Sequence, residues 1–389
     1  MTLNKPNVVV VGGSYVGLKF VDLIAAEVSE THNTILIEKN SHFEHLFAFP
    51  RISIVPGFAH KAYIPYTSAF HASPSGSTSV VHGVVAQVLP DRVVLDSGDS
   101  IPYEYLVIAT GTGLYPARAH NKAEEVEFQE ALQRRVKDAS EVVVIGGGAS
   151  GIQTATDAKE FYPSKNITLV HSRDQLMNRF HPELHSLVSK KLESLGVKVV
   201  LGQRVELPAS GRYPVTGPSY SIGLADGTQL HADVAISCTG AVPMSSLITS
   251  LSPDLIDEYK YIRVKPTMQV QDERFPNVFA VGDVAGTGAN KNARSAFGQI
   301  EVAVKNIKSL IAGEAATAEY VAGPFGIHMT TGLWSWILFR DPTGPDQQPH
   351  VDLQDTSNFI GTPEETGKLQ MGCGRLWEAR APRLADYHL

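Results

Sequence analysis

Cysteine is scarce in this chain. Only two of its 389 residues are cysteines, Cys238 and Cys373, and they lie far apart in the sequence. No C-x-x-C pair or similar dithiol motif is therefore present. Any two-electron chemistry has to run through a bound cofactor, because the sequence offers no redox-active disulfide to carry it.

Runs of basic residues and long apolar runs are also missing. No block of Lys or Arg exceeds two adjacent residues and the formal net charge is −7, so we expect no nucleic-acid partner. No uninterrupted apolar stretch approaches the ~18 residues that span a bilayer, although peripheral contact with a membrane stays open. Residues 1–6 lead directly into the first predicted strand and leave no room for a targeting peptide. We expect a cytoplasmic protein and leave an association with mitochondria open.

The remaining composition is typical of a globular protein. The hydrophobic fraction is 43% and the charged fraction is 19%. A chain of 389 residues suffices for ~2–3 domains with sizeable cores. We predict no metal site, and the sequence is silent on the oligomeric state.

The chain is organised around a buried strand followed by a glycine-rich turn. Four successive valines at residues 8–11 predict a strand that is buried on both faces of a parallel sheet. Gly12 permits a tight turn, and Gly17 lets the predicted helix over residues 18–26 pack close to the strand. The helix N-terminus offers unpaired N–H groups and a positive dipole to a pyrophosphate. Together these features predict a dinucleotide site.

An acidic residue and one substitution complete this first motif. The second predicted strand, residues 34–37, ends on Glu38. That position is about 20 residues beyond the glycines, where a carboxylate can accept hydrogen bonds from ribose hydroxyls. Ser14 stands where the usual motif has its second glycine. Its hydroxyl either hinders the approach of the backbone to the pyrophosphate or contributes a hydrogen bond of its own.

The same order of elements occurs a second time. A predicted strand at residues 141–145 leads into residues 146–151, a complete G-x-G-x-x-G motif that opens a helix. Each copy also contains a turn-rich hairpin. Each closes on a similar segment, since Ile-Ala-Thr-Gly at residues 108–111 corresponds to Ser-Cys-Thr-Gly at residues 237–240. Two dinucleotide folds with matching hairpins are a more specific signal than one glycine-rich turn.

A later segment also ends in an acidic residue. Residues 274–283 predict a strand that closes on Gly282 and Asp283, and Lys291 precedes a helix expected over residues 292–311. An aspartate at the carboxyl edge of a strand can accept hydrogen bonds from the hydroxyls of a polyol. Beside two nucleotide folds, we interpret Asp283 as a contact to the ribityl chain of a flavin.

The segment after the first acidic residue is aromatic and contains histidines. Residues 39–51 predict either a loop and short helix over the sheet or a cover for a ring system. In the second case Arg51 reaches a phosphate or an electron-rich ring edge. Further strands are predicted at residues 80–88, 92–95, 100–103 and 105–113.

With these motifs the chain resembles the two-dinucleotide-fold flavoprotein family of pyridine-nucleotide oxidoreductases. Within it, the chain resembles the apoptosis-inducing-factor-like branch, of the AMID/ferroptosis-suppressor type with its fungal relatives. The resemblance implies an α/β protein with two Rossmann-like dinucleotide-binding folds of three-layer ββα/βαβ architecture and a small C-terminal α+β region. It implies a FAD-binding domain at residues 1–119 and 241–318, an NAD(P)H-binding domain at 120–240 and a C-terminal region at 319–389.

The resemblance also implies a reaction with its cofactors. FAD on the first fold would take hydride from NADPH or NADH on the second. Electrons would then pass to a small-molecule acceptor, either a quinone or a specialised metabolite. Lys291 is the implied catalytic residue, because positive charge at the pyrimidine edge of a flavin stabilises the charge that develops on reduction. The implied cofactor-binding residues are Gly12, Gly13, Ser14, Gly17, Glu38, Lys39, Arg51, Val85, Thr110, Gly111, Gly146, Gly148, Gly151, Arg173, Gly240, Gly282 and Asp283.

Three departures from the family's pattern bear on function. The missing dithiol excludes the disulfide-reductase branch. Gln153 stands where the second fold often has a glutamate, which puts a carboxylate near the nicotinamide in doubt. The third departure is His171, Ser172 and Arg173 after the second strand of that fold, with no acid to repel a 2′-phosphate. NADPH is thus at least as well supported as NADH, and the alternative for Arg173 is an ordinary surface charge.

The tail contains an aromatic apolar run at residues 333–339. It could line an acceptor pocket, contact a membrane or fill a core, and we favour core filling. Two alternatives to a quinone-type oxidoreductase stay open. One is a flavin-dependent tailoring enzyme, suggested by Ser14, Gln153 and the tail, and the other is a non-enzymatic signalling protein that binds FAD and NAD(P). Three histidines are candidates for a general acid and none is preferred: His45, His60 and His328.

Overall fold

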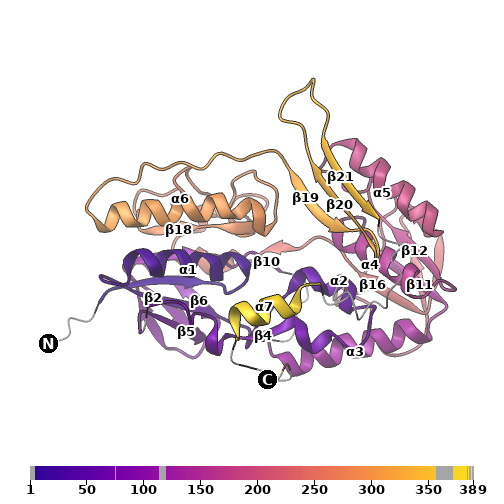
Figure 1. Cartoon of the computed structure of the whole chain (residues 1–389), viewed down its shortest axis with the longest axis horizontal. Helices are drawn as coiled ribbons and strands as arrows, with labels where there is room; N and C mark the ends of the chain where they lie inside the picture. The colour runs from indigo at the N-terminus through magenta and orange to yellow at the C-terminus, as the bar shows by residue number, and fades with distance from the viewer. Residues whose placement is uncertain are drawn as a thin grey trace.

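A five-stranded parallel sheet is the centre of the first half of the molecule (Figure 1). The structure, a computed structural model, describes residues 5–74, 76–113, 120–355, 371–382, 384 and 387. The strands pair in the order β18-β9-β1-β2-β5, and all four pairings are parallel. Their bounds are β1 (Asn7–Val11), β2 (Asn33–Glu38), β5 (Thr78–His82), β9 (Tyr105–Ile108) and β18 (Val278–Ala280).

Two helices pack against this sheet and against each other. Helix α1 (Tyr15–Val28) is longer at both ends than the predicted one. It begins earlier because Ser14 already acts as its N-cap residue. Helix α6 (Ala293–Ile311) follows the prediction closely. Its N-cap is Asn292, whose side chain accepts a hydrogen bond of 2.9 Å from the backbone N–H of Ser295. Asparagine is a favoured residue at this position for that reason.

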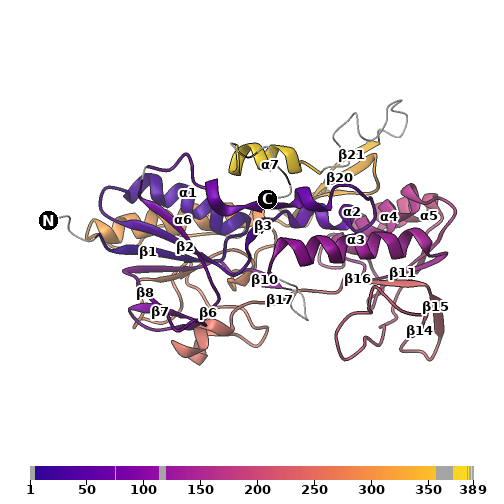
Figure 2. The same cartoon turned by 90° about the horizontal axis from the view of Figure 1, so that it is seen from below.

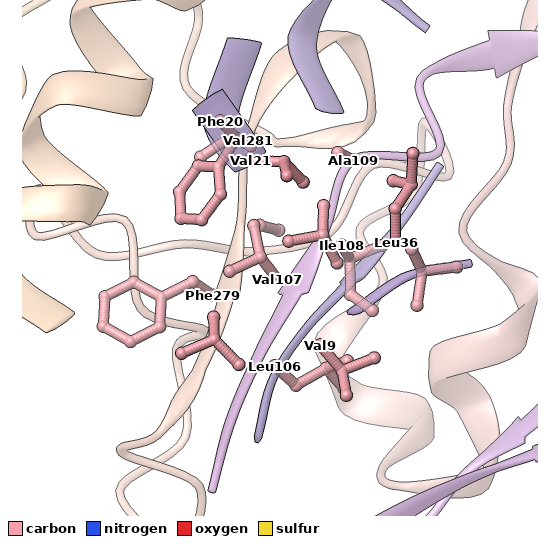
Figure 3. Close-up of a cluster of buried hydrophobic side chains, with 14 of the residues drawn as sticks. Val9, Phe20, Val21, Leu36, Leu106, Val107, Ile108, Ala109, Phe279 and Val281 are labelled. Carbon is pink, nitrogen blue, oxygen red and sulfur yellow. The ribbon is translucent and has the colours of Figure 1, made fainter. Parts of the chain in front are cut away.

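The core of this half lies between the sheet and its helices (Figure 3). The predicted valine strand is buried almost completely, as expected for a central parallel strand. Aromatic side chains from both helix and sheet fill the space beside it. Each such side chain contributes about 1.5–3 kcal/mol when it is fully buried. Labelled members of the cluster with no exposed surface are Val9, Phe20, Val21, Leu36, Leu106, Val107, Ile108, Phe279 and Val281.

A four-stranded parallel sheet forms the second half, with the strand order β13-β12-β11-β16. Its bounds are β11 (Glu141–Ile145), β12 (Asn166–Val170), β13 (Lys198–Val200) and β16 (Val234–Ser237). Its helices are α3 (Lys122–Asp138), α4 (Ala149–Phe161) and α5 (Pro182–Leu195). The order of strand, glycine turn, helix and strand repeats that of the first sheet, which confirms the predicted pair of Rossmann-like folds.

Each large sheet is accompanied by a smaller antiparallel one. The first has β6 (Val85–Val88), β7 (Arg92–Leu95) and β8 (Ser100–Pro102), and the second has β14 (Tyr220–Gly223) and β15 (Gln229–Ala232). Figure 2 shows both on the same side of the molecule. The hairpins that repeat in the sequence thus occupy equivalent places in the two folds.

Three predicted strands are longer than the observed ones by several residues. Of residues 105–113 only β9 (Tyr105–Ile108) joins the large sheet, and of residues 274–283 only β18 (Val278–Ala280) is a strand. Residues 80–88 divide at Gly83, so that β5 completes the large sheet and β6 begins the small one. The division has a local cause. The last pairing of β5 joins His82 to Glu38, and the N–H of Gly83 then donates to the carbonyl oxygen of Glu38 at 2.9 Å. The chain turns away beyond that bond.

The C-terminal region adds a three-stranded antiparallel sheet of β19 (Gly326–Thr330), β20 (Ser335–Arg340) and β21 (His350–Asp355). Alternate residues of β20 point to opposite faces. Ile337 and Phe339 are buried in the core that α4 and α5 share with the second large sheet, whereas Trp336 lies on the other face. Core filling is therefore confirmed for the inward half of the aromatic run.

Short elements complete the described chain. Two small ladders are β3 (His42–Glu44) with β4 (Tyr63–Pro65) and β10 (Thr112–Gly113) with β17 (Val242–Pro243). The short helices are α2 (Phe49–Ile52) and α7 (Cys373–Arg380), with 3-10 turns at Leu46–Ala48, Ala59–Ala62, Tyr66–Ser68, Ser246–Ser250, Pro253–Leu255 and Gly282–Val284.

No helix in the described ranges has both the length and the apolar character that a bilayer crossing requires. The predicted domain boundary at residue 119 lies outside the described residues, and so does part of the predicted C-terminal region, residues 356–370.

Candidate active site

A cavity of about 420 Å³ opens at the carboxyl ends of β1 and β2. This edge of an open α/β sheet is where nucleotides bind in such folds. Five of the residues predicted from the sequence lie together on its wall: Gly12, Glu38, Lys39, Val85 and Thr110. The rest of the lining is Val11, Ile37, Gly83, Val84, Ala86, Met244, Ser246 and Leu247.

The glycine turn at this cavity leaves no room for side chains. Gly12 has a φ of +107°, and a Cβ on it would lie 2.5 Å from the carbonyl oxygen of Ala109, the residue directly after the neighbouring strand β9. A Cβ on Gly17 would overlap the carbonyl oxygen of Gly12. The two glycines therefore allow β1, β9 and α1 to approach each other closely. This brings the start of α1 directly over the end of β1.

Glu38 is buried at the floor of this turn, with 7% of its surface exposed. Its carboxylate accepts hydrogen bonds from the backbone N–H of Gly13 and, at 2.9 Å, from that of Asn40. Tyr66 donates from its hydroxyl to the carbonyl oxygen of Gly13 at 2.8 Å. Burial and the neighbouring charge of Glu38 both raise the pKa of Tyr66, so its hydroxyl remains a donor. The turn is thus fixed on both sides.

These residues fit the adenosine half of FAD. Glu38 supplies oxygens suited to ribose hydroxyls. The side chain of Ser14 makes no cap hydrogen bond to α1, which leaves the first-turn N–H groups for a pyrophosphate. Thr110 and Lys39 complete the wall near Met244: Thr110 donates to its carbonyl oxygen at 2.7 Å, and Lys39 Nζ lies 3.9 Å from its sulfur.

Asp283 and Lys291 flank the start of α6. Asp283 lies in the 3-10 turn after β18, beside Gly282, whose φ is +79°. Burial raises the pKa of Asp283 and lowers the pKa of Lys291, while their mutual attraction opposes both shifts. Lys291 Nζ donates to the carbonyl oxygen of Ala285 at 2.6 Å and lies 4.1 Å from the ring centre of Tyr261. The ammonium is held in place at the edge of the helix N-terminus.

The second fold repeats the glycine turn of the first. Gly146 has a φ of +117°, and a Cβ on Gly151 would overlap the carbonyl oxygen of Gly146. No described atom lies within 4 Å of the place where a Cβ on Gly148 would be. Gly148 is the N-cap residue of α4, so this free space adjoins the helix N-terminus, where a pyrophosphate would bind. Arg173 follows β12 and Gly240 follows β16, the strands on either side of β11, and both residues are exposed.

The interpretation of Arg51 as a ligand of a cofactor phosphate does not agree with the structure. Arg51 is 1% exposed, and its Nε donates to Asp157 Oδ2 at 2.6 Å while its Nη2 donates to the carbonyl oxygen of Gly332 at 2.9 Å. Asp157 lies on α4 and is fully buried. The guanidinium therefore joins α2, α4 and the turn before β20 instead of reaching into the cavity.

Three polar residues on one side of α4 bind β19 and the turn after it, either directly or through Arg51. Gln153 donates to Thr330 Oγ1 at 2.9 Å, Asp157 pairs with the buried arginine, and Glu160 accepts from the N–H of Leu333 at 2.6 Å. We call Gln153, Asp157 and Glu160 the α4 junction. Gln153, which stands where the family often has a glutamate, thus has a structural partner in the C-terminal sheet.

The candidate histidines differ in their surroundings. His45 is buried and lies between the Tyr15 hydroxyl at 2.6 Å and the carbonyl oxygen of Met371 at 2.7 Å, and burial lowers its pKa. His328 packs edge-on against Trp336, with ring centres 4.8 Å apart, and its pKa is lowered by burial and by Arg294. His60 lies in the 3-10 turn Ala59–Ala62.

Sequence reasoning missed the part of the cavity wall around Met244. The ladder of β10 and β17 brings it there, since Thr112 pairs with Pro243 and Gly113 with Val242 where the chain passes between the folds. The repeated Thr-Gly endings at residues 110–111 and 239–240 were the available signal, because equivalent strand ends lead into equivalent crossovers.

Comparison with known proteins agrees with this geometry. The family described as pyridine nucleotide-disulphide oxidoreductase matches residues 6–307. Fe-regulated protein 8 of Mycosarcoma maydis is 32% identical over 358 residues, which cover 85% of this chain and 87% of that protein. Ferroptosis suppressor protein 1 of Xenopus tropicalis is 29% identical over 335 residues, covering 84% and 86%.

A solved structure shares the fold. The sulfide:quinone oxidoreductase of Aquifex aeolicus superposes with a TM-score of 0.75 at 17% identity, over 98% of this chain and 93% of that one. The two glycine turns and the nucleotide cavity agree with these matches. This chain therefore belongs to the pyridine nucleotide-disulphide oxidoreductase family, as an FAD-dependent NAD(P)H oxidoreductase of its apoptosis-inducing-factor-like branch.

Proposed function

We propose that the chain transfers electrons from NAD(P)H through FAD to a small quinone-like acceptor. One observation carries this proposal. The chain has two glycine turns of the nucleotide-binding type, and its two cysteines cannot form a redox-active dithiol. Cys238 and Cys373 are unpaired, and burial raises their pKa values to about 11 and about 12. Thiols of this kind are poor nucleophiles. Electrons must then leave for an external acceptor.

The residues of the chain have separate tasks in this reaction. FAD supplies the hydride and electron chemistry. Glu38, the first-turn N–H groups of α1 and Asp283 would bind its ribose, pyrophosphate and ribityl chain. Lys291 would place positive charge where negative charge develops on reduction. The turn from Gly146 to Gly151 would hold the nicotinamide dinucleotide.

Support for a flat aromatic acceptor comes from the outer face of the C-terminal sheet. Trp336 and His328 lie there with their rings in contact, and the pKa of His328 responds to Arg294 in the first turn of α6. The side chains of Asn290 and Asn292, on either side of Lys291, donate to the carbonyl oxygen of Gly326 at the start of the same sheet. An aromatic surface therefore borders the proposed flavin edge, which favours a flat aromatic acceptor.

Anaerobic mixing tests the proposal. NADPH or NADH should remove the visible absorption of the FAD-loaded protein. A short-chain water-soluble quinone should then restore it, and faster than oxygen does in a parallel aerobic sample. If the nucleotide removes the colour and the quinone fails to restore it, the tailoring-enzyme alternative replaces the quinone. If neither nucleotide removes the colour, the proposed direction of electron flow is wrong.

A substitution of Lys291 gives a graded test. We expect Lys291→Met to slow the loss of flavin absorbance by at least about tenfold, since one charge-assisted hydrogen bond is worth about 1.5–3 kcal/mol. Burial and Arg179 lower the pKa of Lys291. The wild-type rate should therefore fall as pH rises through a value below that of ordinary lysine.

Two variants control this measurement. Lys291→Arg keeps its charge at alkaline pH, so the fall in rate should move to higher pH. Lys265→Met removes a partly exposed lysine that pairs with the exposed Glu273 at 2.7 Å and should leave the rate unchanged. A wild-type rate that is flat up to pH 10, together with an unaffected Lys291→Met variant, would remove Lys291 from the catalytic role.

A further inference from the structure

The two folds of this chain can be compared position by position. In the first, Val11 pairs with Ile37, and the next residue is Glu38. In the second, Ile145 pairs with Val170, and the next residue is His171. The two side chains also make the same contact. Glu38 accepts the N–H of Gly13, and His171 Nδ1 accepts the N–H of Gly147 at 3.0 Å. His171 therefore occupies the place in the second fold that the ribose-binding carboxylate occupies in the first.

This replacement removes a negative charge. Because His171 Nδ1 accepts a hydrogen bond, that nitrogen carries no proton. Burial and the charge of Arg173 lower the pKa of the ring, and a hydrogen bond to the backbone of Gln175 opposes them. The imidazole is thus neutral at neutral pH. It fixes the glycine turn as the carboxylate does, but it does not repel a phosphate.

A cation lies close to this position. Arg173 is exposed, two residues after His171, on the loop that leaves β12. Its carbonyl oxygen accepts the N–H of Gly202 at 3.0 Å, which anchors the loop beside β13. The adjacent acid, Asp174, is turned toward that strand end, since its Oδ1 lies 2.9 Å from where a Cβ on Gly202 would be.

We infer that the second fold selects the 2′-phosphorylated nicotinamide dinucleotide, NADPH, over NADH. A phosphate monoester carries a charge of about −1.5 to −2 at neutral pH. A carboxylate at the position of His171 would repel it, whereas the guanidinium of Arg173 can bind it with two hydrogen bonds. The same turn geometry thus serves two nucleotides: an acid selects the free ribose of FAD and a neutral ring admits a 2′-phosphate. This inference rests on the proposed binding of a nicotinamide nucleotide to the second fold.

Equilibrium binding of the oxidised nucleotides tests this without turnover. Calorimetric titration of the FAD-loaded protein should show that NADP⁺ binds at least about tenfold more tightly than NAD⁺. Arg173→Ala should weaken NADP⁺ binding by about tenfold and leave NAD⁺ binding within about twofold. His171→Glu should reverse the preference, and His171→Gln, which keeps the position neutral, should retain it.

Matched controls make the result specific. Arg134→Ala removes an exposed arginine on α3 and should change neither affinity. The advantage of NADP⁺ should shrink as salt is raised, because an exposed phosphate contact is screened. If His171→Glu fails to fold, the affinities of Arg173→Ala for NADP⁺ and for NAD⁺ decide the test alone.

The inference is overturned if the wild-type protein binds NAD⁺ as tightly as NADP⁺, or if Arg173→Ala weakens both equally. In those cases the flavin is still reduced by either nucleotide and the proposed function stands. If neither nucleotide binds, both the inference and the proposed function are overturned.

Discussion

Asp157→Leu is expected to lower the free energy of unfolding by about 3–5 kcal/mol, because it leaves a buried guanidinium without its counter-charge. The Arg51 and Asp157 side chains are only 2% and 1% exposed, and Nε to Oδ2 is 2.6 Å. Water cannot replace the lost partner at this depth. The remaining bond from Arg51 to the carbonyl oxygen of Gly332 does not neutralise the charge. Urea denaturation followed by tryptophan fluorescence measures the loss.

The double variant Arg51→Met/Asp157→Leu is the informative comparison. It replaces both charges by apolar groups of similar size, and such replacements are often neutral or stabilising. It also removes Asp157 Oδ1, a buried oxygen without a hydrogen-bond partner among the described residues. We expect most of the lost stability to return. The exposed pair Arg134 and Glu130, 3.8 Å apart, is the surface control, and breaking it should cost less than about 1 kcal/mol. A single variant as stable as the wild type would show that this pair is unimportant.

Gly17→Ala is expected to abolish FAD binding or reduce it severely. The added methyl group would overlap the carbonyl oxygen of Gly12, so α1 has to move away from β1. Overpacking of this kind costs about 1–3 kcal/mol in a well-packed core. It also displaces the helix N-terminus from the cavity. The purified variant should be colourless and should take up little added FAD, as measured by its visible absorption and by flavin fluorescence.

Gly323→Ala is the matched control for this substitution. No described atom lies within 4 Å of the place where its Cβ would be, and its backbone is not left-handed. The control should retain full colour. If Gly17→Ala bound FAD normally, the turn after β1 could not be the pyrophosphate site. Gly151→Ala, which repeats the same overlap in the second fold, should lose the nicotinamide nucleotide and keep the flavin.

The central features of the fold could be predicted because their causes are local. The valine strand, the spacing of Gly12 and Gly17, and the acid at Glu38 all lie within one strand–turn–helix–strand unit. Backbone geometry there dictates residue type directly, and the internal repeat supplies an independent check. The start of α6 was predictable for the same reason, since a cap depends on residues three positions apart.

The position of Arg51 could not be predicted in this way. Its partner Asp157 lies 106 residues away, and nothing near Arg51 in the sequence indicates that it points into the protein. An arginine after an aromatic segment suits a phosphate site and a buried ion pair equally well. The wall of the cavity at Met244 could not be predicted for a similar reason, because it depends on how two segments far apart in the sequence pair. The division of residues 80–88 required knowledge of which sheet each half joins.

The α4 junction has a consequence for motion within the protein. Helix α4 begins at the second glycine turn and, further along, is fastened both to α2 and to the turn before β20. Opening a gap between these pieces would strip a desolvated arginine of its counter-ion. Any motion that separates α2 or the turn before β20 from α4 would therefore cost the free energy of breaking a buried ion pair, about 3–5 kcal/mol.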